Sequence, residues 1–199
     1  MIKRIVSACA LALAACGQAE QKQETVSPVA GAPGRDATIG PNGAAGIRAA
    51  LPMSVDDIRL AAPHYTVAAV EDQVEGEPFT AITLSSGDEE MFRVYPTPDR
   101  QHVHAISTRS PQARGPPEDI ISVTTFAVAP PEQVPFCISE VVDGAPGFAC
   151  ATAADATFWR VYRLPDGYDG PSDPFDAIDP DVLHDATLAE MRWIAPRVE

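Results

Sequence analysis

The sequence predicts an α+β domain built from two copies of one unit, a short helix followed by an antiparallel strand meander. Internal sequence similarity supports the duplication: residues 91–95 and residues 158–162 both end in Arg-Val-Tyr after an aromatic residue. Short segments rich in β-branched and aromatic residues, separated by Gly, Pro, Asp and Ser, predict the strands and their turns. We expect two such units to form a layered domain, with sheet on one side and short helices on the other.

The first unit opens on a capped helix. Ser54 is a typical N-cap residue, and Asp57 three residues later forms a weaker relative of the capping box. Val55 and Ile58 fall on one helical face, and Pro63 ends the helix. Four strands are then expected at residues 65–70, 79–84, 91–95 and 102–108.

Four landmarks of the first unit return in the same order in the second unit. They define predicted repeats at about residues 43–111 and 120–196, and their shared order favours duplication. Chance similarity between strand-like segments is the alternative. Two adjacent prolines, Pro130 and Pro131, indicate that the second helix is shorter than the first. Besides the pentamer, the matched pairs are residues 51–54 with 124–127, 76–79 with 144–148, and 106–111 with 191–196.

The N-terminal residues have the pattern of a secretion signal. Lys3 and Arg4 precede an apolar run at residues 5–15, which is too short for a membrane-spanning helix of about 20 residues. The run leads into Leu-Ala-Ala-Cys16, which resembles the lipobox of bacterial lipoproteins. The resemblance implies that cleavage before Cys16 makes it an acylated N-terminus carrying fatty acids such as palmitate. An ordinary signal peptide with a chance cysteine is the alternative.

We therefore divide the chain into a lipoprotein signal at residues 1–15, a flexible tether at 16–38 and a single globular domain at 39–199. The tether has too few large apolar residues to form a core, whereas the domain is long enough for a substantial one. Because Gly17 is not Asp, the enteric sorting pattern implies the outer membrane, with the domain facing the periplasm.

The charge of the chain excludes some classes of partner. The formal net charge is -14 at pH 7. A surface this acidic disfavours binding to nucleic acid and to anionic lipid headgroups. We therefore expect contact with a membrane only through the lipid anchor.

Two of the four cysteines remain for the folded domain, because Cys9 belongs to the signal and Cys16 to the anchor. In an oxidising compartment Cys137 and Cys150 are most simply a disulfide. Closing a loop of about 14 residues stabilises by roughly 3 kcal/mol in the chain-entropy model. The residues between them include two carboxylates and no Lys, Arg or His, which disfavours a reactive thiolate. A metal site built from these two cysteines is the alternative.

The chain resembles the RpoE-regulated lipoproteins, small outer-membrane lipoproteins with a domain of unknown function. The resemblance covers about residues 39–196, and the Pro- and Asp-rich loop before the last strand is longer here than in that pattern. It implies an association with envelope stress, and it carries no assigned active site. The residues that carry it are the lipobox at Cys16, the entry at 39–41, Cys137 and Cys150, the segment 159–162 and the segment 192–194.

Two groups of side chains are candidate metal ligands. His102 and His104 share a face if they lie in a strand, but no third ligand is near them in sequence. Seven aspartates fall between Asp166 and Asp185, and hard oxygen ligands at short spacing suit Ca²⁺. The Asp-x-Asp-x-Asp-Gly pattern of a calcium-binding loop is absent, so a solvated loop is the favoured interpretation of the aspartates. The favoured interpretation of the two histidines is that they are ordinary exposed residues of a strand. We predict no metal and no cofactor.

The sequence predicts a non-enzymatic protein, because it has no nucleophile elbow, phosphate loop or zinc-protease motif. We expect an interaction or maintenance module of the envelope that binds a protein partner and no small molecule. Three aromatic residues, Tyr95, Trp159 and Tyr162, are candidates for an exposed binding face, with core packing as the alternative. A hydrolase with a site assembled from distant residues is the other candidate function.

Overall fold

The computed structural model describes residues 36–74, 76–171, 173 and 178–196. Eight strands in this part of the chain form one antiparallel sheet in the order β3-β4-β5-β6-β10-β9-β8-β7. Cys16 and the signal lie outside the described residues. The eight strands are β3 (Thr66–Val74), β4 (Glu77–Ser86), β5 (Glu89–Pro96), β6 (Val103–Thr108), β7 (Phe136–Val142), β8 (Ala145–Ala151), β9 (Phe158–Arg163) and β10 (Thr187–Ile194).

The fold is mostly β, so the predicted α+β layered class is wrong. The described residues contain two short α-helices, α1 (Val55–Ala61) and α2 (Pro180–Asp185), and two single-turn 3₁₀ helices, η1 (Phe126–Val128) and η2 (Pro131–Gln133). The prolines at 130 and 131 explain why the second unit has only 3₁₀ turns at the position that corresponds to α1, since proline lacks the N–H that a longer helix needs. Loops and a small two-stranded sheet, β1 (Ile39–Gly40) and β2 (Gly43–Ala44), cover the sheet where helices were expected.

The first unit follows its predicted elements closely. Ser54 is the N-cap of α1, where its Oγ accepts a hydrogen bond from the Asp57 amide at 3.1 Å. Only Ile58 of this helix is buried. The four predicted strands of the unit are confirmed as β3 to β6, and β3 to β5 extend beyond the predicted bounds.

The strand order is symmetric about its centre. β5, which contains residues 91–95, is the third strand from one edge, and β9, which contains residues 158–162, is the third from the other. β6 and β10 meet in the middle, where Ile106 pairs with Trp193. The duplication itself stays a prediction, and superposing the two halves is its test.

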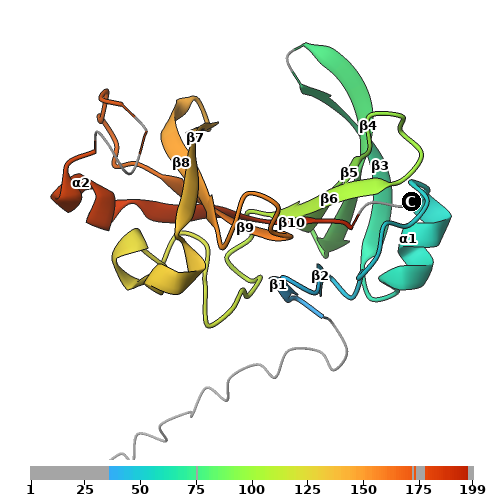
Figure 1. Ribbon diagram of the computed structural model, residues 1–199. Coiled ribbons are helices and arrows are strands. Elements are labelled where there is room, and N and C mark those ends of the chain that lie inside the picture. The colour runs from blue at the N-terminus through green and yellow to red at the C-terminus, as the bar shows by residue number, and fades with distance from the viewer. Residues whose placement is uncertain (1–35, 75, 172, 174–177, 197–199) are drawn as a thin grey trace, which may run out of the picture. The chain divides into compact units, whose positions relative to one another are not determined.

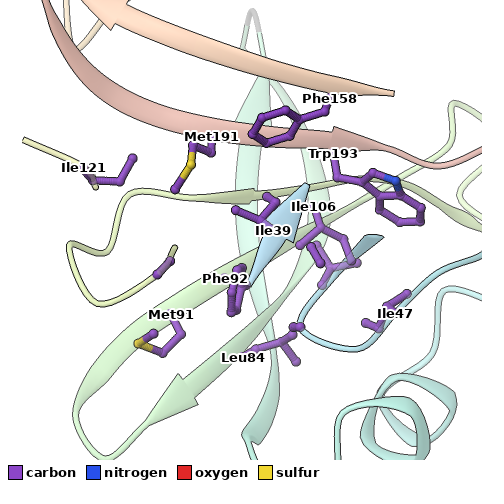
Figure 2. Close-up of a cluster of buried hydrophobic side chains, with 14 of the residues drawn as sticks. Ile39, Ile47, Leu84, Met91, Phe92, Ile106, Ile121, Phe158, Met191 and Trp193 are labelled. Carbon is purple, nitrogen blue, oxygen red and sulfur yellow. The ribbon is translucent and has the colours of Figure 1, made fainter. Parts of the chain in front are cut away.

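One face of the sheet carries the core. Figure 2 shows Trp193, Phe158 and Met191 of the second half packed against Ile106 and Phe92 of the first. The N-terminal segment of the domain adds two fully buried isoleucines, Ile39 and Ile47, to the same cluster. The core is therefore continuous across both halves of the sheet.

A buried ion pair attaches the loop between the two halves to the sheet. Arg160 of β9 is 2% exposed, and its Nε lies 2.6 Å from Oδ2 of Asp119, which is 4% exposed. Arg160 Nη2 also donates to the Pro116 carbonyl and to Oε1 of Gln133. Burial raises the pKa of Asp119, and the guanidinium of Arg160 opposes that rise. The loop therefore contributes one buried charge and several acceptors to the underside of β9.

Candidate functional site

The second face of the sheet is open and polar at its centre; we call it the open face. It is defined by Asp72, Glu90, Arg93 and Tyr95 in the first half, by Arg109 just after β6, and by Glu190, Arg192 and Glu140 in the second half. Figure 1 shows the β3–β4 and β7–β8 hairpins rising on the side opposite β1, β2 and α1, with β6 and β10 between them. The open face is the floor between these hairpins.

A β-bulge places the central carboxylate on this face. Leu188, Met191 and Trp193 of β10 all pack in the core. Leu188 and Glu190 are two residues apart and would share a face in a regular strand, but the register shifts between them. Because of this shift, Glu190 points to the open face beside Arg192 and not into the core.

Glu190 joins two arginines. Its side chain is 6% exposed, and Oε2 accepts from Arg109 Nε at 2.9 Å. Its Oε1 accepts from Arg192 Nε at 3.0 Å and from Nη2 at 2.9 Å. These charge-assisted hydrogen bonds fix both guanidinium groups above the central strands.

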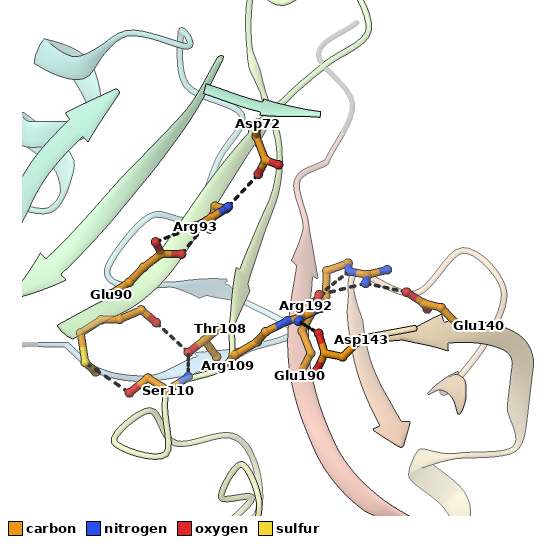
Figure 3. A network of polar contacts seen from close by, with 11 residues as sticks. Asp72, Glu90, Arg93, Thr108, Arg109, Ser110, Glu140, Asp143, Glu190 and Arg192 are labelled. Atoms are coloured by element: carbon orange, nitrogen blue, oxygen red, sulfur yellow. Dashed lines mark hydrogen bonds and ion pairs between the residues drawn. The ribbon is translucent and has the colours of Figure 1, made fainter. Parts of the chain in front are cut away.

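The same two arginines reach the β7–β8 hairpin, as Figure 3 shows. Arg192 Nη2 donates to Glu140 of β7 at 2.9 Å, and Arg109 Nη1 pairs with Asp143 in the hairpin turn. At Gly147 of β8 a Cβ would lie 2.5 Å from the Tyr162 carbonyl oxygen and 2.6 Å from a Val142 methyl, so the hairpin packs closely against β9 only because this residue is glycine. Four carboxyl and guanidinium partners thus tie the hairpin to the centre of the sheet around Glu190.

A second ion-pair group lies on the first half of the open face. Arg93 of β5 donates to Glu90 through Nε and Nη2, each at 2.8 Å, and to Asp72 of β3 at 2.8 Å. Hydrogen bonding to Glu90 raises the pKa of Arg93 despite partial burial. Burial opposes the charge on Arg192, but Glu190 and Glu140 outweigh it and raise its pKa. Both guanidinium groups are therefore permanently charged.

The open face is hollowed along β5 and β6. One hollow of about 670 Å³ is lined by Phe79, Tyr95 and Arg100 among others. A second hollow of about 510 Å³ continues from it, and Asp72, Tyr95 and Arg109 line both. We call the two together the open-face groove. Tyr95 packs against Phe79 with ring centroids 6.2 Å apart, and burial raises the pKa of its hydroxyl.

The three aromatic candidates from the sequence divide between the two faces. Tyr95 and Trp159 are half-buried on the open face, where Trp159 packs edge-on against Phe136. Tyr162 is fully buried and stacks on Phe148, so for this residue the alternative of core packing is correct. The alternation of β9 explains the split, because residues 159 and 162 have opposite parity in the strand.

The histidine and aspartate candidates do not converge. His104 is exposed at the start of β6 and His102 lies just before it, half-buried. Within the described ranges, no group of three His, Cys, Asp or Glu side chains is placed to hold a metal ion. Part of the predicted aspartate loop is the helix α2, for which Asp179 is the N-cap, and Asp176 lies outside the described residues.

Three residues at the centre of the open face, Arg109, Glu190 and Arg192, are not among the site residues predicted from the sequence. Glu190 and Arg192 alternate with apolar residues, which is a signal for one polar face of a strand. Their convergence with Arg109, 81 residues from Glu190 in the chain, depends on the central pairing of β6 with β10. Only the strand order reveals that pairing.

The predicted pair Cys137–Cys150 is joined by a disulfide in the structure. The two residues face each other in register on β7 and β8. Cys150 is fully buried and Cys137 is half-buried. The bond therefore ties the outermost strand of the second half to its neighbour.

Replacing both cysteines, as Cys137→Ala with Cys150→Ala, is expected to lower the free energy of unfolding by about 3 kcal/mol, because the unfolded chain loses a loop constraint. Urea unfolding of the oxidised protein and of the double variant measures the difference. A reductant should destabilise the unsubstituted protein and leave the double variant unchanged, which is the control. Equal stability of oxidised and reduced protein would contradict the prediction.

None of the helices among the described residues is long and apolar enough to cross a membrane. No protein-family model matches the chain, and no curated protein matches it. Among solved structures, the chain is similar to the uncharacterized protein yfeY from Escherichia coli, with a TM-score of 0.56 and 16% sequence identity. The match covers 79% of this chain and 99% of that chain. At this identity the likeness shows a shared fold.

Proposed function

We propose that this chain is a lipid-anchored, non-catalytic module of the bacterial cell envelope that binds a protein partner on the open face of its sheet. The observation that carries the proposal is the open-face groove, where fixed arginines, carboxylates and half-buried aromatic rings line a continuous depression. The opposite face of the sheet is covered by the core.

The chemistry of the groove suits a polypeptide. Arg109 and Arg192 supply donors, Asp72 and Glu190 supply acceptors, and Tyr95 adds apolar area with a hydroxyl. A peptide backbone offers both acceptors and donors, and arginine and tyrosine are enriched at the energetic centres of protein interfaces. Because the ion pairs fix these side chains before binding, less conformational entropy is lost on association.

The envelope location is supported by the sequence and by the cysteines. The lipobox ending at Cys16 supports a lipid anchor, and the Cys137–Cys150 disulfide suits an oxidising compartment. Together with the residues that resemble the RpoE-regulated lipoproteins, these features support membership in that family and a place in the outer membrane. Two or three acyl chains on one cysteine are sufficient for stable anchoring, since a single chain binds only marginally.

Site-specific crosslinking tests the binding face. A photoreactive residue at Arg100, on the wall of the groove, is expected to capture a protein in living cells. The same residue at Leu60, which is 81% exposed on α1, is the matched control and is expected to give no such product. Adding Arg109→Ala to the Arg100 probe should reduce the product several-fold. Equal products from both positions, or none from Arg100, would contradict the proposed face.

The substitution Cys16→Ser tests the anchor. Without the thiol there is no acceptor for the diacylglyceryl group, so the variant is expected to move from the membrane fraction to the soluble fraction. Flotation of membranes followed by immunoblotting measures the distribution, and Cys9→Ser, within the signal, is the control that should leave it unchanged. A Cys16→Ser variant that still floats with membranes rules out lipid anchoring at this residue.

A further inference from the structure

The sheet ends in two edge strands, β3 and β7. An edge strand presents unpaired backbone N–H and C=O groups, and proteins usually protect such edges with charge, proline or a covering segment. β3 has adjacent carboxylates at Glu71 and Asp72, which disfavour the approach of another acidic chain. β7 has a single charged residue, Glu140, and its charge is already paired with Arg192.

The register with β8 shows which backbone groups of β7 face outward. Cys137 and Cys150 are directly opposite, with a Cα–Cα distance of 4.1 Å. In antiparallel ladders such close pairs are the non-hydrogen-bonded ones, at about 4.5 Å against about 5.5 Å for the hydrogen-bonded pairs. The pattern alternates along the strand, so the N–H and C=O groups of Ser139 and Val141 also point away from β8.

This outer edge is accessible. Val141 is 72% exposed and Ile138 is 47% exposed, and Ser139 between them is also exposed. In the described part of the chain, no backbone hydrogen bond from another segment reaches the outward groups of residues 137, 139 and 141. The disulfide fixes β7 to β8, so the edge is held in an extended conformation before any partner arrives.

We propose that β7 pairs with β7 of a second copy of this chain, antiparallel and with the two-fold axis beside Ser139. In this register Ser139 faces Ser139 of the second copy, and Cys137 faces Val141, so every outward donor meets an outward acceptor. Ile138 lies opposite Glu140, so no like charges are directly opposed. Two chains of net charge -14 repel each other, and of the two sheet edges β7 adds the smaller repulsion, since its one carboxylate is paired with Arg192. The eight-stranded sheets then join into one continuous sheet.

The substitution Ser139→Pro tests the interface. Proline removes an outward N–H while leaving the hydrogen bonds between β7 and β8 intact. The two-fold axis makes the substitution act twice, so the dissociation constant is expected to rise about 30-fold or more through two lost hydrogen bonds. Sedimentation velocity of the full chain over a concentration series measures it, with Cys16→Ser in every sample so that no acyl chain drives association. Ser139→Ala keeps the N–H and should associate as the unsubstituted chain does.

A second measurement is independent of proline's effect on folding. Ser139→Cys should be joined to its counterpart by a short bifunctional maleimide, whereas Ala69→Cys, exposed on the β3 edge, should not. Crosslinked dimer only from position 139 supports the pairing. A chain that remains monomeric throughout the concentration series overturns the proposal, as does a dimer that forms equally well with Ser139→Pro or crosslinks equally from position 69.

Discussion

The substitution Asp119→Ala is expected to lower the free energy of unfolding by about 3–5 kcal/mol, because it leaves the charge of Arg160 buried without its partner. Arg160 and Asp119 are 2% and 4% exposed, so water cannot replace the lost carboxylate without opening the core. The Pro116 carbonyl and the Gln133 amide oxygen remain as acceptors, but neither carries a charge. Urea denaturation followed by far-UV circular dichroism measures the change.

Two companion variants identify the cause. The double variant Asp119→Leu with Arg160→Met removes both charges and should recover most of the lost stability, since apolar replacements of buried ion pairs are often neutral. Tyr162→Phe is the local control: its hydroxyl is buried with no partner among the described residues, so its removal should be neutral or slightly stabilising. A cost below about 1 kcal/mol for Asp119→Ala would show that the pair contributes no more than a surface ion pair.

Local signals were sufficient for the strands of the first unit and for α1. The cap at Ser54, the stop at Pro63 and the turns at Gly76 and Gly87 are all encoded within a few residues. Both glycines adopt positive φ, which an L-residue rarely does, so the turns are specified by residue type. The pairing of Cys137 with Cys150 is likewise local, because the two lie on one hairpin.

The predicted fold class was wrong because local sequence patterns do not reveal which segments cover the core face of the sheet. Ile39 and Ile47 look like isolated apolar residues in a Gly- and Pro-rich segment, yet they are fully buried beneath the sheet. Neither has the periodicity of a helix or a strand, so sequence patterns assign them no layer. The sheet is therefore covered by loops that are recognisable only after the strands have been assembled.

The candidate site depends on the same long-range order. No glycine or proline predicts the bulge that turns Glu190 to the open face, since the residues around it are Leu188, Ala189 and Met191. In a regular strand Leu188 and Glu190 would lie on the same face. A prediction from the sequence that places Leu188 in the core would therefore place Glu190 there too, on the wrong face. Once Glu190 is placed, Arg109 and Arg192 follow as its partners, and the charge network of the groove is fixed.

Core and groove meet at β10, which carries Trp193 on one face and Arg192 on the other. The face that binds a partner in the proposed function is thus stiffened by the packing of the face behind it. Protein interiors are close-packed, so a void beneath β10 is felt by neighbouring strands on both sides. Stability and the geometry of the groove are therefore expected to change together when this strand is loosened.

The substitution Trp193→Ala is accordingly expected to destabilise the fold by about 3–5 kcal/mol. Trp193 is 1% exposed, and it lies between Ile106 of β6 and Phe158 of β9, where the two halves of the sheet join. Removing the indole leaves a cavity that neighbours on rigid strands fill only in part. Thermal and urea unfolding measure the loss.

The other tryptophan provides the matched control for this substitution. Trp159 is half-buried on the open face, so Trp159→Ala should cost clearly less, although it also removes the hydrogen bond from Nε1 to the Ala156 carbonyl at 2.9 Å. Each single variant retains one tryptophan, so its emission reports one environment: blue-shifted from Trp193 in the core and nearer the solvent value from Trp159. Equal costs for the two substitutions would contradict a core that passes through the centre of β10.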